Sequence, residues 1–176
     1  MQGLVHIYTG DGKGKTTAAL GLALRAAGTG KKVIMIQFLK DTPCGELESA
    51  KLFGDNFKIL RFQKGQKGFI WEMSEEEIEV LKKETKDGLN NASRIAKSGE
   101  CDVLILDEIF GCLGNMLISE DELIDFIKDK NESTELVLTG RNAPQRVCAL
   151  AHYVSEIRAV KHPLYSGIPA REGIEF

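Results

Sequence analysis

Apolar runs alternate with amphipathic segments along most of the chain. Six runs rich in Val, Ile and Leu predict strands at residues 4–8, 33–38, 57–62, 102–108, 135–140 and 153–160. Between them, apolar spacing and end signals predict helices at residues 16–27, after Ser74, at 120–128 and at 143–151. Strands that are apolar on both faces and alternate with helices are typical of an α/β fold with a mostly parallel sheet covered on both sides.

Two of the predicted helices begin with a capping box, in which a serine and a glutamate three residues later satisfy each other's backbone N–H groups. Ser74 precedes Glu77 in this way, and Ser119 precedes Glu122. The helix after Ser74 is long, although Gly88 weakens its middle. Residues 63–72 and the tail 161–176 show neither the helical nor the strand spacing of apolar residues. Both are therefore expected to be loops that can contribute to a site.

Composition narrows the function classes. A chain of 176 residues suits a single domain over residues 1–176, and its net charge of −3 gives no electrostatic reason to expect nucleic acid or a membrane surface as partner. No apolar stretch is long enough to span a bilayer, and no signal sequence is evident. The cysteines form no C-x-x-C pair, so they are expected to be reduced thiols of a cytoplasmic protein: Cys44, Cys101, Cys112 and Cys148.

The strongest motif is the stretch "TGDGKGKTT", which joins the first predicted strand to the first predicted helix. It fits the second half of a P-loop, but Thr9 stands where the first glycine is usual. Lys15 is expected to contact phosphate oxygens, with help from the positive end of the helix. All nine residues are candidate ATP contacts: Thr9, Gly10, Asp11, Gly12, Lys13, Gly14, Lys15, Thr16 and Thr17. A glycine-rich turn with incidental lysines is the competing interpretation, and Lys13 in particular could simply be solvated.

The run "LILDE" resembles a Walker B strand, which places a carboxylate beside the magnesium ion of a P-loop. We therefore expect Mg²⁺ to be bound by Thr16, Asp107 and Glu108. Glu108 could also activate water or orient the nucleotide. The two motifs together predict a three-layer P-loop NTPase fold of the RecA-like type, with about six strands.

Further motifs occur in the order found in ATP:corrinoid adenosyltransferases of the CobA/CobO/BtuR type, and the chain resembles that family over nearly its whole length. They are the P-loop with its leading threonine, "QFLK" followed by "GE", "GFIWE", and "TGRNAP" leading to "SEIRAVKHP". The resemblance implies that the 5′-deoxyadenosyl group of ATP is transferred to the Co(I) centre of a reduced corrinoid, such as cobalamin or a precursor, with release of tripolyphosphate. It further implies that ATP is held in reverse relative to ordinary P-loop enzymes.

The resemblance also implies roles for other residues. Phe69 and Trp71 match positions that lie beneath the corrinoid, where apolar rings leave the cobalt four-coordinate; packing in the core is the alternative. Arg141 and Asn142 follow the fifth predicted strand at the same edge of the sheet, so both are candidate contacts of ATP, with a capping or surface role as the alternative. Contacts with the ribose or corrinoid are open for Lys40 and Glu46, as is contact with the site for the tail residues Lys161, His162 and Pro163.

Partners follow from the resemblance as well: a homodimer, and a reductase or flavodoxin-type electron donor. Several relatives carry an extension before the first strand that helps to cover the site. In this chain, which starts at the strand, the tail or the second subunit is expected to provide that cover.

Two other functions compete with the transferase. A RecA-like ATPase or phosphotransferase, with ADP as product, suits Glu108, although no arginine-rich lid is evident. A regulatory module would bind ATP without turnover and use "GFIWE" to dock a protein.

Overall fold

Six parallel strands form one sheet in the computed structural model, which describes residues 2–63 and 70–175. The strands are β1 (Val5–Thr9), β2 (Val33–Gln37), β3 (Phe57–Leu60), β4 (Val103–Asp107), β5 (Glu135–Thr139) and β6 (Tyr153–Glu156). Their order is β3-β2-β4-β5-β1-β6, and every pairing is parallel. The predicted α/β class with about six strands is confirmed.

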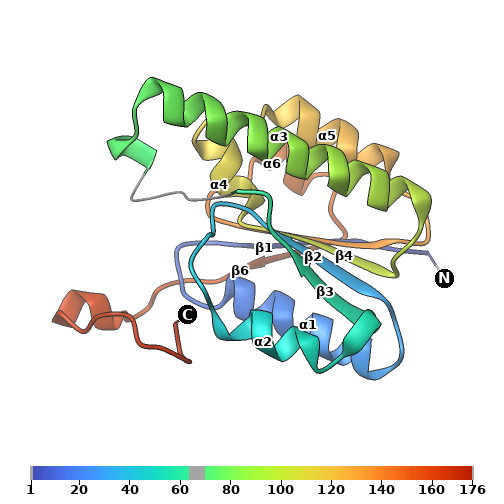
Figure 1. Cartoon of the computed structure of the whole chain (residues 1–176), viewed down its shortest axis with the longest axis horizontal. Helices are drawn as coiled ribbons and strands as arrows, with labels where there is room; N and C mark the ends of the chain where they lie inside the picture. The colour runs from blue at the N-terminus through green and yellow to red at the C-terminus, as the bar shows by residue number, and fades with distance from the viewer. Residues whose placement is uncertain (1, 64–69, 176) are drawn as a thin grey trace.

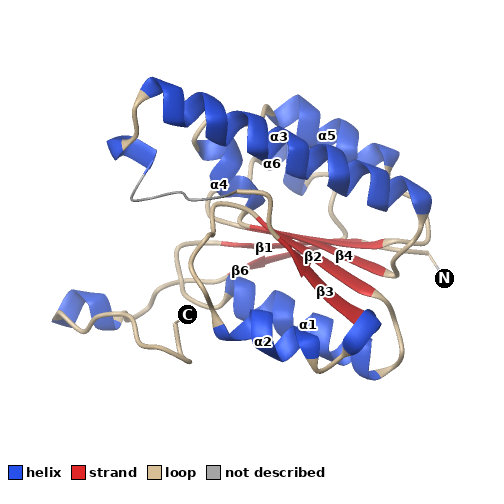
Figure 2. Ribbon diagram, viewed as in Figure 1, coloured by secondary structure: helices blue, strands red, loops and turns tan. Residues whose placement is uncertain are grey.

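Helices cover both faces of this sheet, which gives the predicted three layers (Figures 1 and 2). One layer holds α1 (Lys15–Gly28) and α2 (Gly45–Lys51). The other holds α3 (Glu75–Ser98), α4 (Ile109–Gly114), α5 (Glu120–Asp129) and α6 (Gln145–Cys148). Short 3₁₀ turns occur at η1 (Gly54–Asn56), η2 (Ile70–Glu72) and η3 (Pro163–Ser166).

The central strand β4 explains why the sheet needs a cover on both sides. Successive side chains of a strand point to opposite faces. Leu104 and Leu106 accordingly join the core beneath α3 and α5, whereas Val103 and Ile105 join the core beneath α1. Apart from Lys15 at its start, the buried positions of α1 are alanines, so this helix lies close to the strands: Ala19, Ala23, Ala26 and Ala27.

Gly88, which weakened the prediction of the long helix, has a packing role within α3. A Cβ atom at this position would lie 3.0 Å from the ring of Phe38 and 3.3 Å from that of Phe62. The missing side chain therefore makes room for two aromatic rings at the ends of the β2 and β3 regions. Both predicted capping boxes are confirmed, at Ser74 with Glu77 and at Ser119 with Glu122.

The structure differs from the local predictions in two places. The strand predicted at 153–160 ends at Glu156, because the next residues turn to lie against the glycine loop after β1. The short helices α2 and α4 were not predicted, since seven and six residues are too few for a helical period to stand out. Within the described residues of the tail, 161–175, the only element is the short turn η3, in agreement with a loop.

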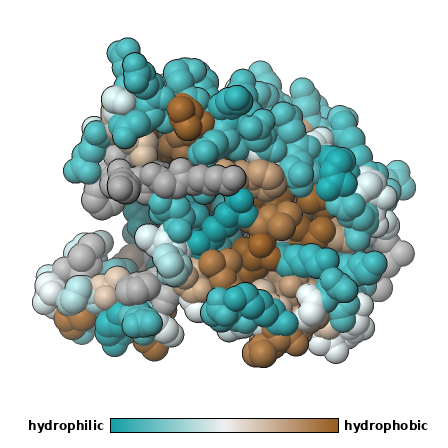
Figure 3. Space-filling model, viewed as in Figure 1, coloured by the Kyte–Doolittle hydropathy of each residue, from teal (hydrophilic) through white to brown (hydrophobic). Residues whose placement is uncertain are grey.

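The outer surface agrees with this layering. Figure 3 shows hydrophilic residues over the upper helical layer and an apolar area near the middle of this face, around the β3 edge of the sheet. Within the described part of the chain, no helix has both the length and the apolar character needed to cross a membrane.

The two-sided burial of β4 leads to a stability prediction. Leu104→Ala should lower the free energy of unfolding by about 2–5 kcal/mol, because the side chain is fully buried and its loss leaves a cavity. Urea unfolding measures the change. Leu52→Ala, which removes the same atoms from a side chain that is 86% exposed, should change it by less than about 0.5 kcal/mol. Equal losses for the two variants would contradict this account of the core.

Candidate functional site: a nucleotide cavity at the carboxyl ends of the strands

The loop between β1 and α1 is shaped by the segment that follows β6. Gly10 and Gly14 have φ values of 101° and 126°, which side chains with a Cβ atom rarely adopt. A Cβ atom on Gly12 would lie 2.7 Å from the backbone of Arg158, and the Gly12 N–H donates to the Ile157 carbonyl at 2.8 Å. Gly12 is one of the predicted ATP contacts, and its N–H already has a partner within the protein.

Thr9 and Asp11 brace the same loop from two other directions. The Ala143 N–H donates to Thr9 Oγ1 at 3.2 Å, and the Ala159 N–H donates to Asp11 Oδ1 at 3.1 Å. The second bond holds the pKa of Asp11 below its ordinary value. Both residues thus tie the loop to its neighbours.

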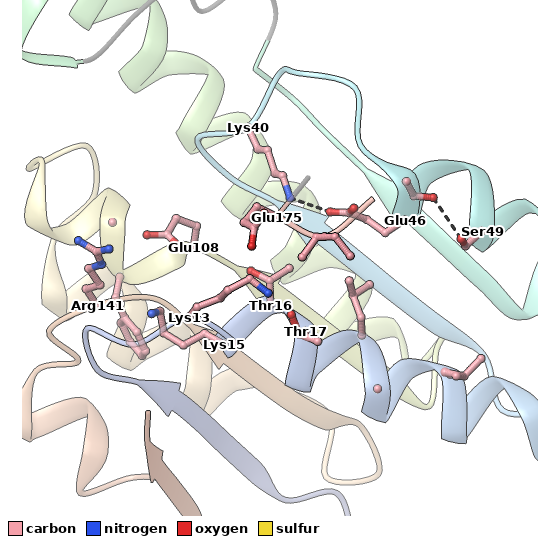
Figure 4. Close-up of a pocket in the computed structure, with 18 of the residues that line it drawn as sticks. Lys13, Lys15, Thr16, Thr17, Lys40, Glu46, Ser49, Glu108, Arg141 and Glu175 are labelled. Atoms are coloured by element: carbon pink, nitrogen blue, oxygen red, sulfur yellow. Dashed lines mark hydrogen bonds and ion pairs between the residues drawn. The ribbon is translucent and has the colours of Figure 1, made fainter. Parts of the chain in front are cut away.

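A cavity of about 1190 Å³ opens beside this loop. The second half of the predicted ATP site lines it: Lys13, Gly14, Lys15, Thr16 and Thr17. The first four residues of the motif, Thr9 to Gly12, are not among its lining residues. The other walls come from α2, the start of α4, the residues after β5, and the end of the tail (Figure 4).

Cationic side chains lie at the loop end of the cavity. Lys15 is buried and donates from Nζ to the Gly12 carbonyl at 2.7 Å. Burial lowers its pKa, and the charge of Arg141 adds to this effect. Arg141 and Asn142 both line the cavity where the chain leaves β5, as predicted from their place after a strand. Figure 4 shows Arg141, Lys13 and Lys15 on one side of the cavity.

Asp107 forms the centre of the buried polar cluster that the two motifs predict. Its side chain is 2% exposed, and Oδ1 accepts from the hydroxyls of Thr16, at 2.9 Å, and Thr139, at 2.7 Å. Burial raises the pKa of Asp107, and these hydrogen bonds offset only part of that rise. Thr16 and Asp107, 91 residues apart in the chain, are therefore in direct contact.

Glu108 follows in a backbone conformation that is uncommon for its type, with φ of 60°. Its N–H donates to Thr139 Oγ1 at 2.9 Å, which stabilises this conformation, and its side chain faces the cavity (Figure 4). Burial and the neighbouring charge of Asp107 raise its pKa. Gly111 leaves room for the carboxylate, because a Cβ atom there would lie 3.1 Å from Glu108 Oε1.

These groups have the chemistry of a magnesium site. Mg²⁺ binds few protein oxygens and takes its remaining ligands from water and phosphates. The Thr16 hydroxyl and the carboxylates of Asp107 and Glu108 are oxygen ligands of this kind, at the edge of the cavity. Among the described residues, no group of three or more His, Cys, Asp or Glu side chains is placed to hold a metal. Two carboxylates and one hydroxyl fit an ion that takes its remaining ligands from water and a phosphate.

A second polar cluster lies across the cavity, where Glu46 in the first turn of α2 meets Gln37 and Lys40 from the end of β2 and the segment after it. Lys40 donates to Glu46 at 2.6 Å, and Gln37 donates to the same oxygen at 3.0 Å. Burial raises the pKa of Glu46, but these hydrogen bonds outweigh it and lower the pKa to about 2. Lys40 and Glu46 both line the cavity, so Glu46 is a permanent anion in its wall.

Gln37 links the two clusters, because its amide also lies 3.4 Å from Asp107 Oδ2. Neither Gln37 nor Thr139 was predicted. Each is a polar residue that ends an apolar strand, β2 or β5, which is the same signal that identified Asp107 on β4.

Of the two residues predicted to contact the corrinoid, the structure describes only Trp71. Phe69 lies outside the described residues. Trp71 is 77% exposed and lines the cavity, so the alternative that it packs in the core is wrong. Gln63 anchors the start of this region, since its side-chain oxygen accepts from the Leu39 N–H at 2.8 Å and its amide donates to Thr85 at 3.0 Å.

The tail reaches the same cavity through its last residues. Gly173, Ile174 and Glu175 line it, whereas Lys161, His162 and Pro163 are not among its lining residues. Arg171 pairs with the Glu175 carboxylate at 3.2 Å.

The strand order and the glycine-rich loop together define the class of fold to which this protein belongs. A glycine-rich loop joins β1 to α1, and β5 separates β1 from the strand that ends in Asp107. This is the P-loop-like α/β class with a RecA-like strand order. Over residues 1–176 the chain matches the family described as ATP:corrinoid adenosyltransferase BtuR/CobO/CobP, and it belongs to that family.

Individual relatives agree with this assignment. The chain is 32% identical over 176 residues to the corrinoid adenosyltransferase of Escherichia coli (strain K12), covering 99% of this chain and 86% of that protein. It is 35% identical over 178 residues to the corrinoid adenosyltransferase of a Sinorhizobium species, covering 99% and 81%. The corrinoid adenosyltransferase CobA of Salmonella typhimurium is 32% identical over 176 residues, with 99% and 86% covered.

The contacts of Thr139 lead to a prediction about the cluster at Asp107. Thr139→Val keeps the shape of the side chain but removes the hydroxyl that serves both Asp107 and the Glu108 N–H. It should lower the free energy of unfolding by about 1–3 kcal/mol, as expected for buried groups left without a partner. Thr139→Ser, which keeps the hydroxyl, should lose distinctly less in the same urea titration. A valine variant more stable than the serine variant would show that the hydroxyl is dispensable.

Proposed function

We propose that this protein transfers the 5′-deoxyadenosyl group of MgATP to the Co(I) centre of a reduced corrinoid and releases tripolyphosphate. One observation carries the proposal beyond family membership: the phosphate-binding residues and the exposed Trp71 line a single cavity. A nucleotide on the loop would thus share its cavity with an apolar aromatic surface suited to a corrinoid ring.

The reaction is a displacement at the ribose C5′ carbon. The electron pair on cobalt forms the Co–C bond, while the C5′–O bond breaks and its electrons pass to the departing triphosphate oxygen. No proton moves in this step, so no general base is required. Glu108 is then a metal-binding and orienting residue, and the raised pKa that burial gives it is no obstacle to turnover.

Stabilisation of the leaving group is the main task of the protein in this mechanism. Lys15 and Arg141, together with the start of α1, supply positive charge where the triphosphate gains negative charge. Thr16, Asp107 and Glu108 would hold Mg²⁺, which when bound supplies further positive charge to the phosphates. Positioning of C5′ against the cobalt supplies much of the remaining rate enhancement.

On the corrinoid side, Trp71, with Phe69, would exclude water from the lower face of the ring and keep the cobalt without a lower axial ligand. This arrangement eases reduction to Co(I). The resemblance to the family supports further parts of the proposal: one catalytic domain per chain, a homodimer, and a reductase or flavodoxin-type protein as the electron source.

Lys15→Ala should reduce transfer by about 10²–10³-fold while leaving the fold intact, because it removes a buried cation from the leaving group. The assay is anaerobic, with MgATP and chemically reduced cob(I)alamin, followed by absorbance and by analysis of the phosphate product. Lys51→Ala, at an exposed position on α2, is the matched control. Adenosylcobalamin with tripolyphosphate is the expected wild-type product; ADP and phosphate without alkylation would place the protein among ATPases.

Trp71→Ala should impair the reaction that starts from Co(II) and a reductase more than the reaction that starts from chemically reduced Co(I). The reason is that the ring acts on the coordination of cobalt before reduction, and not on the displacement itself. Trp71→Phe keeps an apolar ring and should retain most of the activity in both assays. Equal losses of Trp71→Ala in the two assays would argue for a purely structural role.

A further inference from the structure

A row of polar side chains crosses one end of the sheet, where the strands stop. In the register of the sheet Gln37 lies beside Asp107, and the pairing of Ile36 with Leu60 places Arg61 on the other side of Gln37. Side chains at neighbouring register positions point to the same face of a sheet. The row therefore runs from Arg61, just after the edge strand β3, inward to the carboxylate of Asp107.

The hydrogen bonds along this row fix the orientation of the Gln37 amide. Arg61 donates from Nε and Nη2 to Gln37 Oε1, at 2.9 and 2.7 Å. The amide nitrogen of Gln37 then donates to Glu46 Oε1 at 3.0 Å and lies 3.4 Å from Asp107 Oδ2. A guanidinium group only donates hydrogen bonds, and an ionised carboxylate only accepts them. The amide therefore satisfies both sides in one orientation alone, with its oxygen toward Arg61.

Arg61 is well placed to hold this orientation. Gln37 is fully buried, so a reversed amide would turn its oxygen toward the two carboxylates with no water between them. Arg61 Nη1 also donates to the Thr42 carbonyl at 2.7 Å, and Nη2 lies 2.7 Å from Cys44 Sγ, so the guanidinium is itself fixed. Neither Arg61 nor Gln37 is among the residues that line the cavity, so both act on a ligand only through other side chains.

We propose that Arg61 is a positioning residue of the metal site, because it fixes the Gln37 amide that in turn holds the Asp107 carboxylate for Mg²⁺. The inference rests on the proposed function, since it takes MgATP as the ligand. Two threonine hydroxyls hold Oδ1 of Asp107, and the Gln37 amide is the group beside Oδ2. If that amide turns away, the carboxylate is held through one oxygen only, and it meets a cation in a less defined geometry.

Calorimetry without corrinoid tests this inference, because it separates metal-dependent binding from binding of the nucleotide alone. ATP is titrated into the wild type, Arg61→Leu and Arg61→Lys, once with excess Mg²⁺ and once with EDTA. Both variants should lose roughly tenfold in affinity with Mg²⁺ and less than about threefold with EDTA, as is typical when a group that orients a metal ligand is removed. Lys58→Leu removes an exposed cation of β3 that pairs with Asp55, and it should bind as the wild type does under both conditions.

Arg61→Lys distinguishes orientation of the amide from charge. Lysine keeps the positive charge but lacks the rigid fork that places two N–H groups on one oxygen. If Arg61→Lys bound ATP with Mg²⁺ as tightly as the wild type, orientation by the fork would be unnecessary and the inference overturned. This variant decides the matter even if Arg61→Leu does not fold.

A double-mutant cycle tests the route through Gln37. In a Gln37→Leu background, Arg61→Leu should reduce the affinity with Mg²⁺ by less than about a further twofold, because the amide that it orients is already absent. Fully additive losses would show that Arg61 acts through its other contacts, at Thr42 and Cys44, and would overturn the inference.

The two conditions also separate this inference from the proposed function. Equal losses of Arg61→Leu with Mg²⁺ and with EDTA would make Arg61 a structural residue, which overturns the inference and leaves the proposed function intact. Failure of the wild type to bind ATP under either condition would remove the proposed function itself, and with it the metal site that Arg61 supports.

Discussion

The burial of the Asp107 carboxylate is the constraint on which the site depends. An ionised carboxylate in an apolar sheet is costly unless hydrogen bonds or a cation compensate it. Here the hydroxyls of Thr16 and Thr139 both donate to it, from the start of α1 and the end of β5. The loop, the acidic strand and the strand between them are thereby fixed relative to one another.

The same cluster connects stability to ligand binding. Burial still raises the pKa of Asp107 in spite of its hydrogen bonds, so the native protein retains part of the desolvation cost. A divalent cation bound between Asp107 and a phosphate would offset that cost.

The sequence predicted those elements that show a regular spacing of apolar residues or begin with a local motif. The β4 run is apolar at every position before Asp107 and was recognisable as a buried strand, and the capping boxes at Ser74 and Ser119 are local signals. The contacts of Gly12 were not predictable, because Ile157 and Arg158 approach it from a distant part of the chain. Gln37 and Thr139 were missed for a related reason. A polar residue at the end of a strand can be assigned to the site only when the strand order is known and places it beside Asp107.

The two acidic clusters show why a phosphate loop alone does not define a reaction. Asp107 and Glu108 lie beside Thr16, where their charge can be shared with a cation, whereas Glu46 lies across the cavity and is already neutralised by Lys40. The first pair adds negative charge beside the loop, whereas the ion pair of Glu46 with Lys40 carries little net charge. An enzyme that transfers the terminal phosphate must expose the outer end of ATP, whereas one that alkylates a metal must expose the ribose.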